Sequence, residues 1–357
     1  MFNLLRKSWW KWAGAYLLII SVTASLCVPL APGVISVSEY RVALGETYEL
    51  EIETYNTNLK KAEESLIVML QYEVDEQKEL ICASSVEVTD NYNLKATFDL
   101  PSTFPRPEKA AFFSLICNND IDGTFELREA MILDKENSEF GLEGYFECEP
   151  EVSTNEPDRM VFPFRETLRE TIRNLMLHVP MWFTMTFLVL FSFISSLMYL
   201  RTSKESWDVL AMSSAVTAIL FGFLGLFTGM LWANYTWGHP WPGDAKLNGA
   251  AIGVLTYLAY LVLRGSLDDP EKRARISAVY SVFAFVIYVL FVFVLPRLTD
   301  SLHPGNGGNP AFSQYDLDNT LRKFFYPAVI GWAILGFWIM SIYARISLIR
   351  IKFWERD

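Results

Sequence analysis

The 357-residue sequence predicts an integral membrane protein, a bundle of six transmembrane helices with an all-β, sandwich-like extracytoplasmic domain inserted between helices 1 and 2. Three observations predict this fold class. Six segments are long and apolar enough to cross a bilayer. A strongly acidic stretch separates the first of them from the second. Inside that stretch, apolar and polar residues alternate with the period of a β-strand.

The six apolar segments each approach the roughly 20 residues that a helix needs to cross a bilayer. Residues 187–194, Phe-Leu-Val-Leu-Phe-Ser-Phe-Ile, are too apolar for the core of a soluble domain. The first segment exceeds the apolar region of a signal peptide, which indicates a retained helix with Cys27 as a small apolar residue inside it. The predicted spans are Trp10–Leu30, Val179–Leu200, Val209–Leu231, Gly249–Leu263, Ile276–Leu295 and Tyr326–Tyr343.

Basic residues predict the orientation of these spans. They cluster before span 1, between spans 2 and 3, between spans 4 and 5, and after span 6. The positive-inside rule then places both termini in the cytoplasm and the acidic insert outside. The clusters consist of Arg6, Lys7, Lys11, Arg201, Lys204, Lys272, Arg273, Arg275, Arg345, Arg350, Lys352 and Arg356.

The insert is marked by charge and by alternation. About 30 of the 41 acidic residues lie between residues 36 and 170, against about 12 of the 30 basic ones. Such acidity argues against nucleic-acid binding and favours a well-solvated domain. The alternating runs predict short antiparallel strands in a small β-sandwich, with a docking or spacer role. These runs are Tyr48–Thr54, Leu66–Tyr72, Ser85–Val88, Phe112–Ile116 and Thr124–Ile132.

Three cysteines, Cys82, Cys117 and Cys148, fall in this outer region, where disulfides persist. We expect a Cys82–Cys117 bridge, because both residues lie in predicted strands, and one leftover thiol. An inert structural thiol is the expected state of the leftover cysteine, and a redox-active thiol is the alternative.

The three histidines carry the functional hypothesis. His178 lies at the outer start of the second span and His303 in the loop after the fifth, so the topology returns both to one interface. Neutral imidazole is a standard axial ligand of haem iron, and two such side chains can hold one iron from opposite faces. The alternative is that both histidines bond headgroups or backbone. His239 lies among turn-forming residues and is not expected to be a ligand.

A tryptophan-rich loop over residues 232–246 falls on the same side. Trp232, Trp237 and Trp241 exceed what anchoring at an interface requires, and they offer a stacking surface for a porphyrin. Asp244 is expected either to orient a ligand or to cap the fourth helix. Lys246 is a candidate partner for a propionate. Further outer candidates for that role are Arg173, Arg297 and Arg322, although basic residues near helix ends often extend to lipid headgroups.

Other motifs restrict the function. The sequence has no phosphate loop, dinucleotide fingerprint or Cys-x-x-Cys pair, so neither ATP hydrolysis nor thiol exchange is assigned to it. The run Gly225-Leu-Phe-Thr-Gly229 predicts close helix packing and nothing more.

Three motifs together resemble the CcmC/CcsA haem-handling proteins of cytochrome c maturation, over roughly residues 174–345. They are Leu177-His-Val-Pro180, Trp237-Gly-x-x-Trp241-x-x-Asp244-Ala-Lys246-Leu247 and Leu302-His303. In that family two outer histidines ligate haem and a tryptophan-rich loop, the WWD domain, holds it. The resemblance assigns these roles to His178, His303, Trp237, Trp241 and Asp244.

Three departures from the family pattern stand out. Gly243 occupies the place of a tryptophan that usually precedes the aspartate, and Lys246 stands where the family often has a propionate-binding arginine. Lysine keeps the charge but loses the bidentate fork. The acidic insert is also absent from the minimal pattern, and it either substitutes for a partner subunit or recruits one.

The resemblance implies a haem-binding and delivery protein, not an enzyme, with b-type haem in transit. It implies a bacterial inner-membrane location and, as partners, a haem chaperone or cytochrome c synthase machinery, with ABC transporter subunits as further candidates. The number of spans and histidines favours the CcmC type. The alternatives are a bis-histidine electron-transfer subunit, or a non-haem receptor or scaffold acting through its β domain.

The expected organisation has four parts. They are residues 1–31 (cytoplasmic N-terminus and helix 1), 32–160 (acidic β-rich domain), 161–345 (five-helix haem-handling domain with loops 232–246 and 296–323) and 346–357 (cytoplasmic tail).

Overall fold

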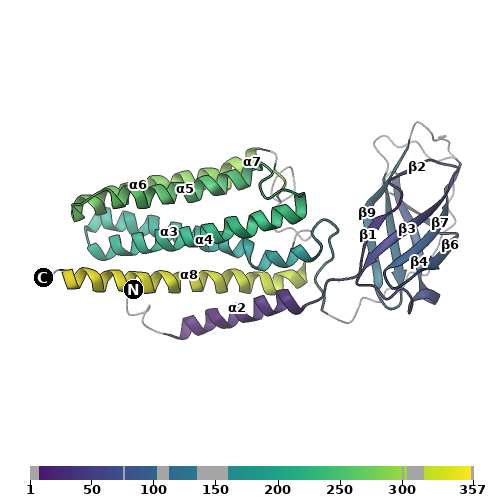
Figure 1. The fold of residues 1–357 in the computed structure, drawn as a ribbon, viewed down its shortest axis with the longest axis horizontal. Coiled ribbons are helices and arrows are strands. Elements are labelled where there is room, and N and C mark those ends of the chain that lie inside the picture. Colours follow the sequence, from purple (N-terminus) through teal and green to yellow (C-terminus); the bar gives the residue numbers. More distant parts are fainter. Residues whose placement is uncertain are drawn as a thin grey trace. The chain divides into compact units, whose positions relative to one another are not determined.

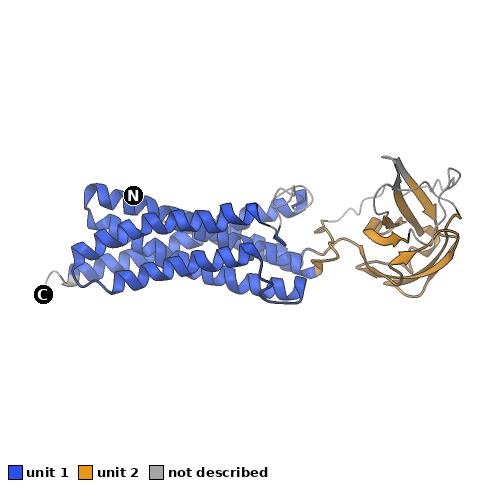
Figure 2. Ribbon diagram, turned by 90° about the horizontal axis from the view of Figure 1, so that it is seen from above, with its two compact units in different colours: residues 1–28, 170–357 blue, residues 29–169 orange. Residues whose placement is uncertain are grey.

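The computed structural model describes residues 8–74, 77–102, 112–134, 160–299, 301–303 and 317–354. The chain divides into two compact units (Figure 2). One comprises residues 1–28 and 170–357, and the other residues 29–169. We call them the membrane unit and the β unit.

The membrane unit is helical (Figure 1). Within the described residues, six helices are long and apolar enough to cross a membrane, which confirms the six predicted spans of a multi-pass membrane protein. The elements are α2 (Trp9–Cys27), the 3₁₀ helix η2 (Arg169–Met176), α3 (His178–Thr202), α4 (Glu205–Trp237), α5 (Ala245–Gly265), α6 (Pro270–Val289), the π-helix η3 (Leu290–Val294), α7 (Leu295–Leu298) and α8 (Asn319–Trp354).

Caps that the sequence supplies bound the starts of α5 and α6 and the end of α4. The Asp269 side chain accepts from the Lys272 amide, and Pro270 occupies the first turn of α6. Gly238, with φ of 77°, ends α4 in a left-handed conformation that glycine adopts without steric cost. The segment predicted as a loop over 232–246 is therefore helical up to Trp237, which corrects the prediction by more than a turn.

Small residues allow the membrane helices to approach closely. A Cβ on Gly14 of α2 would lie 2.3 Å from Ile334 of α8, and these two helices run side by side in Figure 1. Ser192 of α3 is buried and donates to the Ala211 carbonyl of α4 at 2.8 Å. The start of α3, the end of α4, the start of α5 and the end of α7 lie at one end of the bundle (Figure 1). We name it the histidine end.

A buried ion pair joins α4 to α5 at the opposite end of the bundle. Arg264 donates from Nη1 and Nη2 to the two oxygens of Asp208, at 2.7 and 2.5 Å, and both side chains are nearly buried. This two-pronged geometry is the one that makes a buried charge pair tolerable, because each charge has a directed partner.

The β unit contains two sheets (Figure 1). Their strand orders are β1-β3-β7-β6 and β2-β9-β8-β4-β5. Among the described strands the pairings are antiparallel, apart from the short parallel one between β2 and β9. The strands are β1 (Gly33–Val37), β2 (Arg41–Val42), β3 (Thr47–Tyr55), β4 (Ile67–Val74), β5 (Gln77–Cys82), β6 (Ser85–Val88), β7 (Asn93–Asp99), β8 (Phe112–Asn119) and β9 (Gly123–Leu133).

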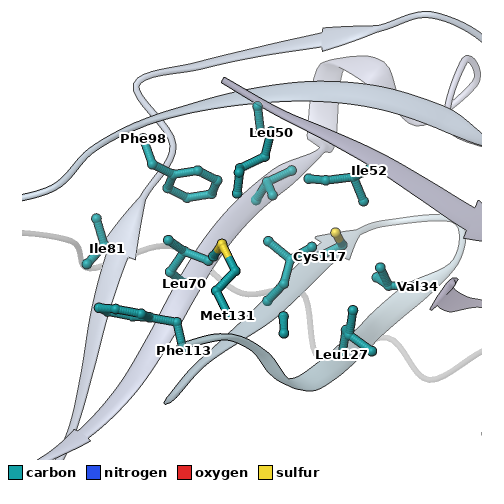
Figure 3. Packing of buried hydrophobic residues seen from close by; sticks show 14 of the residues in the cluster. Val34, Leu50, Ile52, Leu70, Ile81, Phe98, Phe113, Cys117, Leu127 and Met131 are labelled. Atoms are coloured by element: carbon teal, nitrogen blue, oxygen red, sulfur yellow. The ribbon is translucent and has the colours of Figure 1, made fainter. Parts of the chain in front are cut away.

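One hydrophobic core draws side chains from both sheets (Figure 3). Leu50 and Phe98 come from the first sheet, and Leu70, Phe113 and Met131 from the second. The alternating burial along β3 follows from its alternating sequence, because every second side chain of a strand faces the same way. The five predicted runs all form strands, whereas their arrangement as a sandwich stays a prediction.

The expected Cys82–Cys117 bridge is wrong. Cys82 is disulfide-bonded, but Cys117 is a free, buried thiol. The register explains why: Cys82 pairs with Met69 on one side of β4, and Cys117 pairs with Val68 on the other. A whole strand thus separates them, about 9–10 Å at ordinary strand spacing, which is beyond the reach of a disulfide. Burial raises the pKa of the Cys117 thiol to about 12, which fits a structural role. Cys148 lies outside the described residues.

Candidate functional site

His178 is the first residue of α3 and packs against α4 at the histidine end. Its Nδ1 lies 3.1 Å from Thr228 Oγ1. The Thr228 hydroxyl donates its only hydrogen to the carbonyls of the preceding turn, at 2.8 Å from the Leu224 oxygen. When the hydroxyl proton is given to that carbonyl, the Thr228 oxygen accepts from His178 Nδ1–H, and this is the arrangement that satisfies every group. This tautomer leaves the Nε2 lone pair of His178 for a ligand.

Two glycines of α4 make the room that His178 occupies. A Cβ on Gly229 would lie 2.7 Å from His178 Cε1, and one on Gly225 would lie 2.8 Å from Trp182. Trp182 and Trp232 meet the imidazole edge-to-face, with centroid distances of 6.4 and 5.7 Å. The run that predicted only helix packing thus shapes the surroundings of a candidate ligand.

His303 lies in the described segment 301–303, after α7. The edge of its ring meets Trp237 at a centroid distance of 5.1 Å. Its Nδ1 lies 3.1 Å from Asp244 Oδ1, at an oblique angle that makes the contact electrostatic more than a well-directed hydrogen bond. About a quarter of the His303 side chain is exposed, whereas the Asp244 side chain is almost wholly buried.

Asp244 is the N-cap of α5 and links that helix to the His303 segment. Its Oδ1 accepts from the Lys246 amide at 2.8 Å, and its Oδ2 accepts from the Leu302 amide at 2.8 Å. Burial raises the pKa of this carboxyl, but the contacts with His303, Ser301 and the Leu302 amide lower it by more. The pKa therefore lies below its usual range, and Asp244 is a carboxylate at neutral pH. The expected helix cap is confirmed, and the same carboxylate also contacts His303.

The predicted tryptophans lie in two different environments. Trp232 and Trp237 project from the last turns of α4 toward His178 and His303, and Trp232 also donates to Thr171 at 3.1 Å. Trp241 lies in the turn after α4, donates to Asn248 at 3.0 Å and is 39% exposed. Trp182, Thr228 and Gly229 were not predicted as site residues. Trp182 lies one helical turn after His178, and that spacing is the signal that identifies it.

The basic candidates also differ. Arg173 forms an ion pair with Glu170 and donates to the Ser25 and Val28 carbonyls at the end of α2, so its guanidinium is engaged there. Lys246 lies half-buried in the first turn of α5, beside Asp244. His239 is exposed in the turn after α4.

Taken together, these residues fit a flat, iron-containing ligand. His178 and His303 both contact the last turns of α4, His178 through Thr228 and Trp232 and His303 through Trp237. Each has a protein group within 3.1 Å of Nδ1, and tryptophan rings flank both imidazoles. Among the described residues, no group of three or more His, Cys, Asp or Glu side chains is placed to hold a bare metal ion.

The fold and this site define a class, a multi-pass membrane protein that carries paired histidines among tryptophans at its helix ends. Comparison with known sequences supplies the family. The profile of CcmC, described as Heme exporter protein C, matches residues 160–357, more than half of the chain. The chain belongs to this family, as the sequence motifs predicted. The match leaves the strands of the β unit outside.

Several curated relatives carry the same description. The chain is 37% identical to Heme exporter protein C of Bradyrhizobium diazoefficiens over 110 residues, which are 30% of this chain and 41% of that protein. It is 25% identical to the Paracoccus denitrificans protein of that name over 182 residues, 51% and 72% of the two chains. Cytochrome c biogenesis protein CcsA of Prochlorococcus marinus is 36% identical over 91 residues, 26% and 29% of the two chains. The matched part thus spans about two fifths of the Bradyrhizobium relative.

Proposed function

We propose that this protein binds haem at the histidine end and presents it to a partner for cytochrome c maturation. His178 and His303 are the proposed axial ligands, each through Nε2. Haem supplies the iron that these two nitrogens bind. The proposal places the histidine end at the outer surface of a bacterial cytoplasmic membrane, with both termini in the cytoplasm, as the basic clusters predict.

The proposal rests mainly on one feature that the two imidazoles share, a protein group beside Nδ1. Residues 125 positions apart in sequence are brought to one end of the bundle, and each has its Nδ1 turned to a protein partner. Metal-binding histidines need this arrangement, because the partner fixes the tautomer and the ring orientation. Histidines that only anchored the helices at an interface would need neither a fixed tautomer nor a fixed ring orientation.

The remaining site residues serve binding and shielding. Trp232 and Trp237 supply apolar surface beside the two histidines, which favours burial of a porphyrin face. Trp241, which is more exposed, covers an outer edge in this proposal, and Lys246 pairs with a propionate. Asp244 supports His303 instead of contacting the ligand, since its oxygens accept from protein donors.

The position of the ligands favours delivery over resident electron transfer. His178 starts a helix and His303 follows one, so neither lies in the middle of a span. A site at the end of the bundle allows a haem edge to reach a partner at the membrane surface. The proposed partners are a haem chaperone or the cytochrome c synthase machinery, with ABC transporter subunits acting in the same system.

The test is the visible spectrum of detergent-purified protein from haem-replete cells, beside His178→Ala, His303→Ala and His239→Ala variants. We expect a low-spin Soret band in the wild type, lost or shifted in the first two variants and unchanged in the third, whose histidine is exposed outside the site. Absence of haem from the wild type, even after reconstitution, would contradict the proposal.

A further inference from the structure

The two histidines have chemically different partners. His178 Nδ1 faces a neutral hydroxyl, Thr228 Oγ1. That hydroxyl oxygen is held by its own donation to the preceding turn of α4, so it is an acceptor of fixed position but no net charge. His303 Nδ1 faces the carboxylate of Asp244.

The Asp244 side chain is fixed by hydrogen bonds and by burial. Its two oxygens accept from amides at the start of α5 and from the Leu302 amide, and its side chain is about 1% exposed. The contact with Leu302 also anchors the backbone next to His303. Asp244 therefore fixes the His303 ring and the segment that carries it.

We propose that the two histidines hold iron unequally, with His303 as the retained ligand and His178 as the ligand that is released first. The inference rests on the proposed haem-binding function. It assigns Asp244 and Thr228 as positioning residues that set the two bond strengths through their contacts with Nδ1.

The physical reason lies in how a partner on Nδ1 changes the donor strength of Nε2. The Asp244 carboxylate places a negative charge 3.1 Å from His303 Nδ1, and this charge favours donation of electron density from Nε2 to iron. The Thr228 hydroxyl beside His178 carries no net charge and has a smaller effect. His303 is therefore the better electron donor to iron, and a partner that competes for one axial position displaces His178 with less opposition.

The geometry supports the same order. Movement of His303 away from a bound ligand would separate both the Leu302 amide and the imidazole from Asp244. His178, in contrast, packs against Gly229, Trp182 and Trp232, none of which carries a charge. The ligand can leave His178 while His303 still holds it.

The experiment measures haem per protein after gel filtration for His178→Gly and His303→Gly, each with and without added imidazole. His239→Gly is the control for the substitution itself, because that histidine is exposed in a turn. We expect His178→Gly to retain several-fold more haem than His303→Gly, and imidazole to restore both, which shows that the sites are folded. Equal retention, or more in His303→Gly, would overturn the proposal.

A second pair of variants keeps both histidines. Asp244→Asn keeps one oxygen to cap α5, but it removes the charge behind His303 and loses the acceptor for the Leu302 amide. Thr228→Val removes the hydroxyl behind His178. We expect Asp244→Asn to weaken haem retention by about 10–100-fold, measured by transfer to apomyoglobin, and Thr228→Val to weaken it less. The reverse order would refute the inference. Wild-type protein without haem would instead refute the proposed function itself.

Discussion

Gly229 is the residue on which the position of His178 depends most directly. The imidazole lies where a side chain at position 229 would project, and the nearest ring atom is 2.7 Å from the place of an added Cβ. Real Cβ atoms do not approach that closely, so any larger residue must move the ring or the helix. Sequence patterns identified Gly229 as a packing residue, but they could not show that its packing partner is a candidate iron ligand.

We predict that Gly229→Ala lowers haem occupancy and shifts the low-spin spectrum, because the methyl group displaces His178 from its contact with Thr228. The measurement is the Soret absorbance per protein in purified samples. Gly265→Ala is the matched control, since a Cβ at Gly265 meets no atom within 4 Å. Equal occupancy in the two variants would show that His178 tolerates the shift or does not bind haem.

The backbone conformation at Gly243 explains why glycine suits the place of the tryptophan in the family pattern. Its φ is 76°, and a Cβ there would meet nothing within 4 Å. Space is therefore available for a tryptophan, but the left-handed backbone disfavours one. The turn before Asp244 has a conformation that suits glycine, and this conformation was not evident from the motif.

We expect Gly243→Trp to lower the melting temperature and to leave haem occupancy no higher than in the wild type, because the backbone strain of about 1–2 kcal/mol offsets added stacking. Gly243→Asn should be milder, since asparagine tolerates the left-handed region. Thermal unfolding in detergent checks both variants. A tryptophan variant with wild-type stability and raised occupancy would contradict the strain argument.

At the scale of elements, α5 sets the position of the last turns before His303. A Cβ on Gly249 would lie 2.1 Å from the Phe291 carbonyl oxygen, and one on Gly253 would lie 3.0 Å from the Tyr288 ring. The helix thus packs its backbone directly on the π-helix η3. Because Asp244 caps the same helix, α5 contacts the segment before His303 and the segment that contains it.

We predict that Gly249→Ala destabilises the membrane unit by about 1–3 kcal/mol, the usual cost of overpacking, and also lowers haem occupancy through displacement of η3. The readouts are the melting temperature in detergent and the Soret absorbance. Gly265→Ala, in the same helix, should change neither. Loss of stability with full occupancy would mean that η3 does not position His303.

The sequence predicted the elements better than their contacts. Hydropathy reveals spans because a bilayer imposes the same requirement on each helix regardless of its neighbours. Gly238 is a sequence signal for the end of α4 at Trp237. The π-helix η3, in contrast, packs closely against α5, and such a contact is not visible in the sequence. The pairing of Cys82 failed because strand order, with β4 between β5 and β8, is a long-range property.

The candidate site was predicted in part. Family motifs identified His178, His303 and Asp244, and the structure brings His303 and Asp244 into contact. Thr228 is an unremarkable residue in an apolar helix, so only its distance to His178 shows its importance. Arg173 looked like a propionate ligand, but its donors are directed to the end of α2.

At the scale of the whole molecule, each unit has its own core. The β unit buries residues of both sheets in one cluster, and the membrane unit buries a separate one. Residues that belong to one cluster stabilise that cluster, so the two units are expected to fold by their own contacts.

We therefore predict that replacement of residues 32–160 by a short flexible linker leaves haem occupancy of the membrane unit unchanged. The spectrum and monodispersity of the purified variant check this, with the full-length protein beside it. Cytochrome c maturation in cells then reports whether the β unit recruits a partner. A variant that assembles normally but contains no haem would show that the insert contributes to the site.

Both ends of the β unit are fastened where the chain leaves and rejoins the membrane unit. The Arg173 guanidinium binds the Ser25 and Val28 carbonyls, and just beyond them Leu30 and Phe162 form a parallel bridge. Contacts within each unit thus hold the two segments that connect them. We expect that the β unit can be exchanged for that of a homologue at these segments while the histidine site is retained.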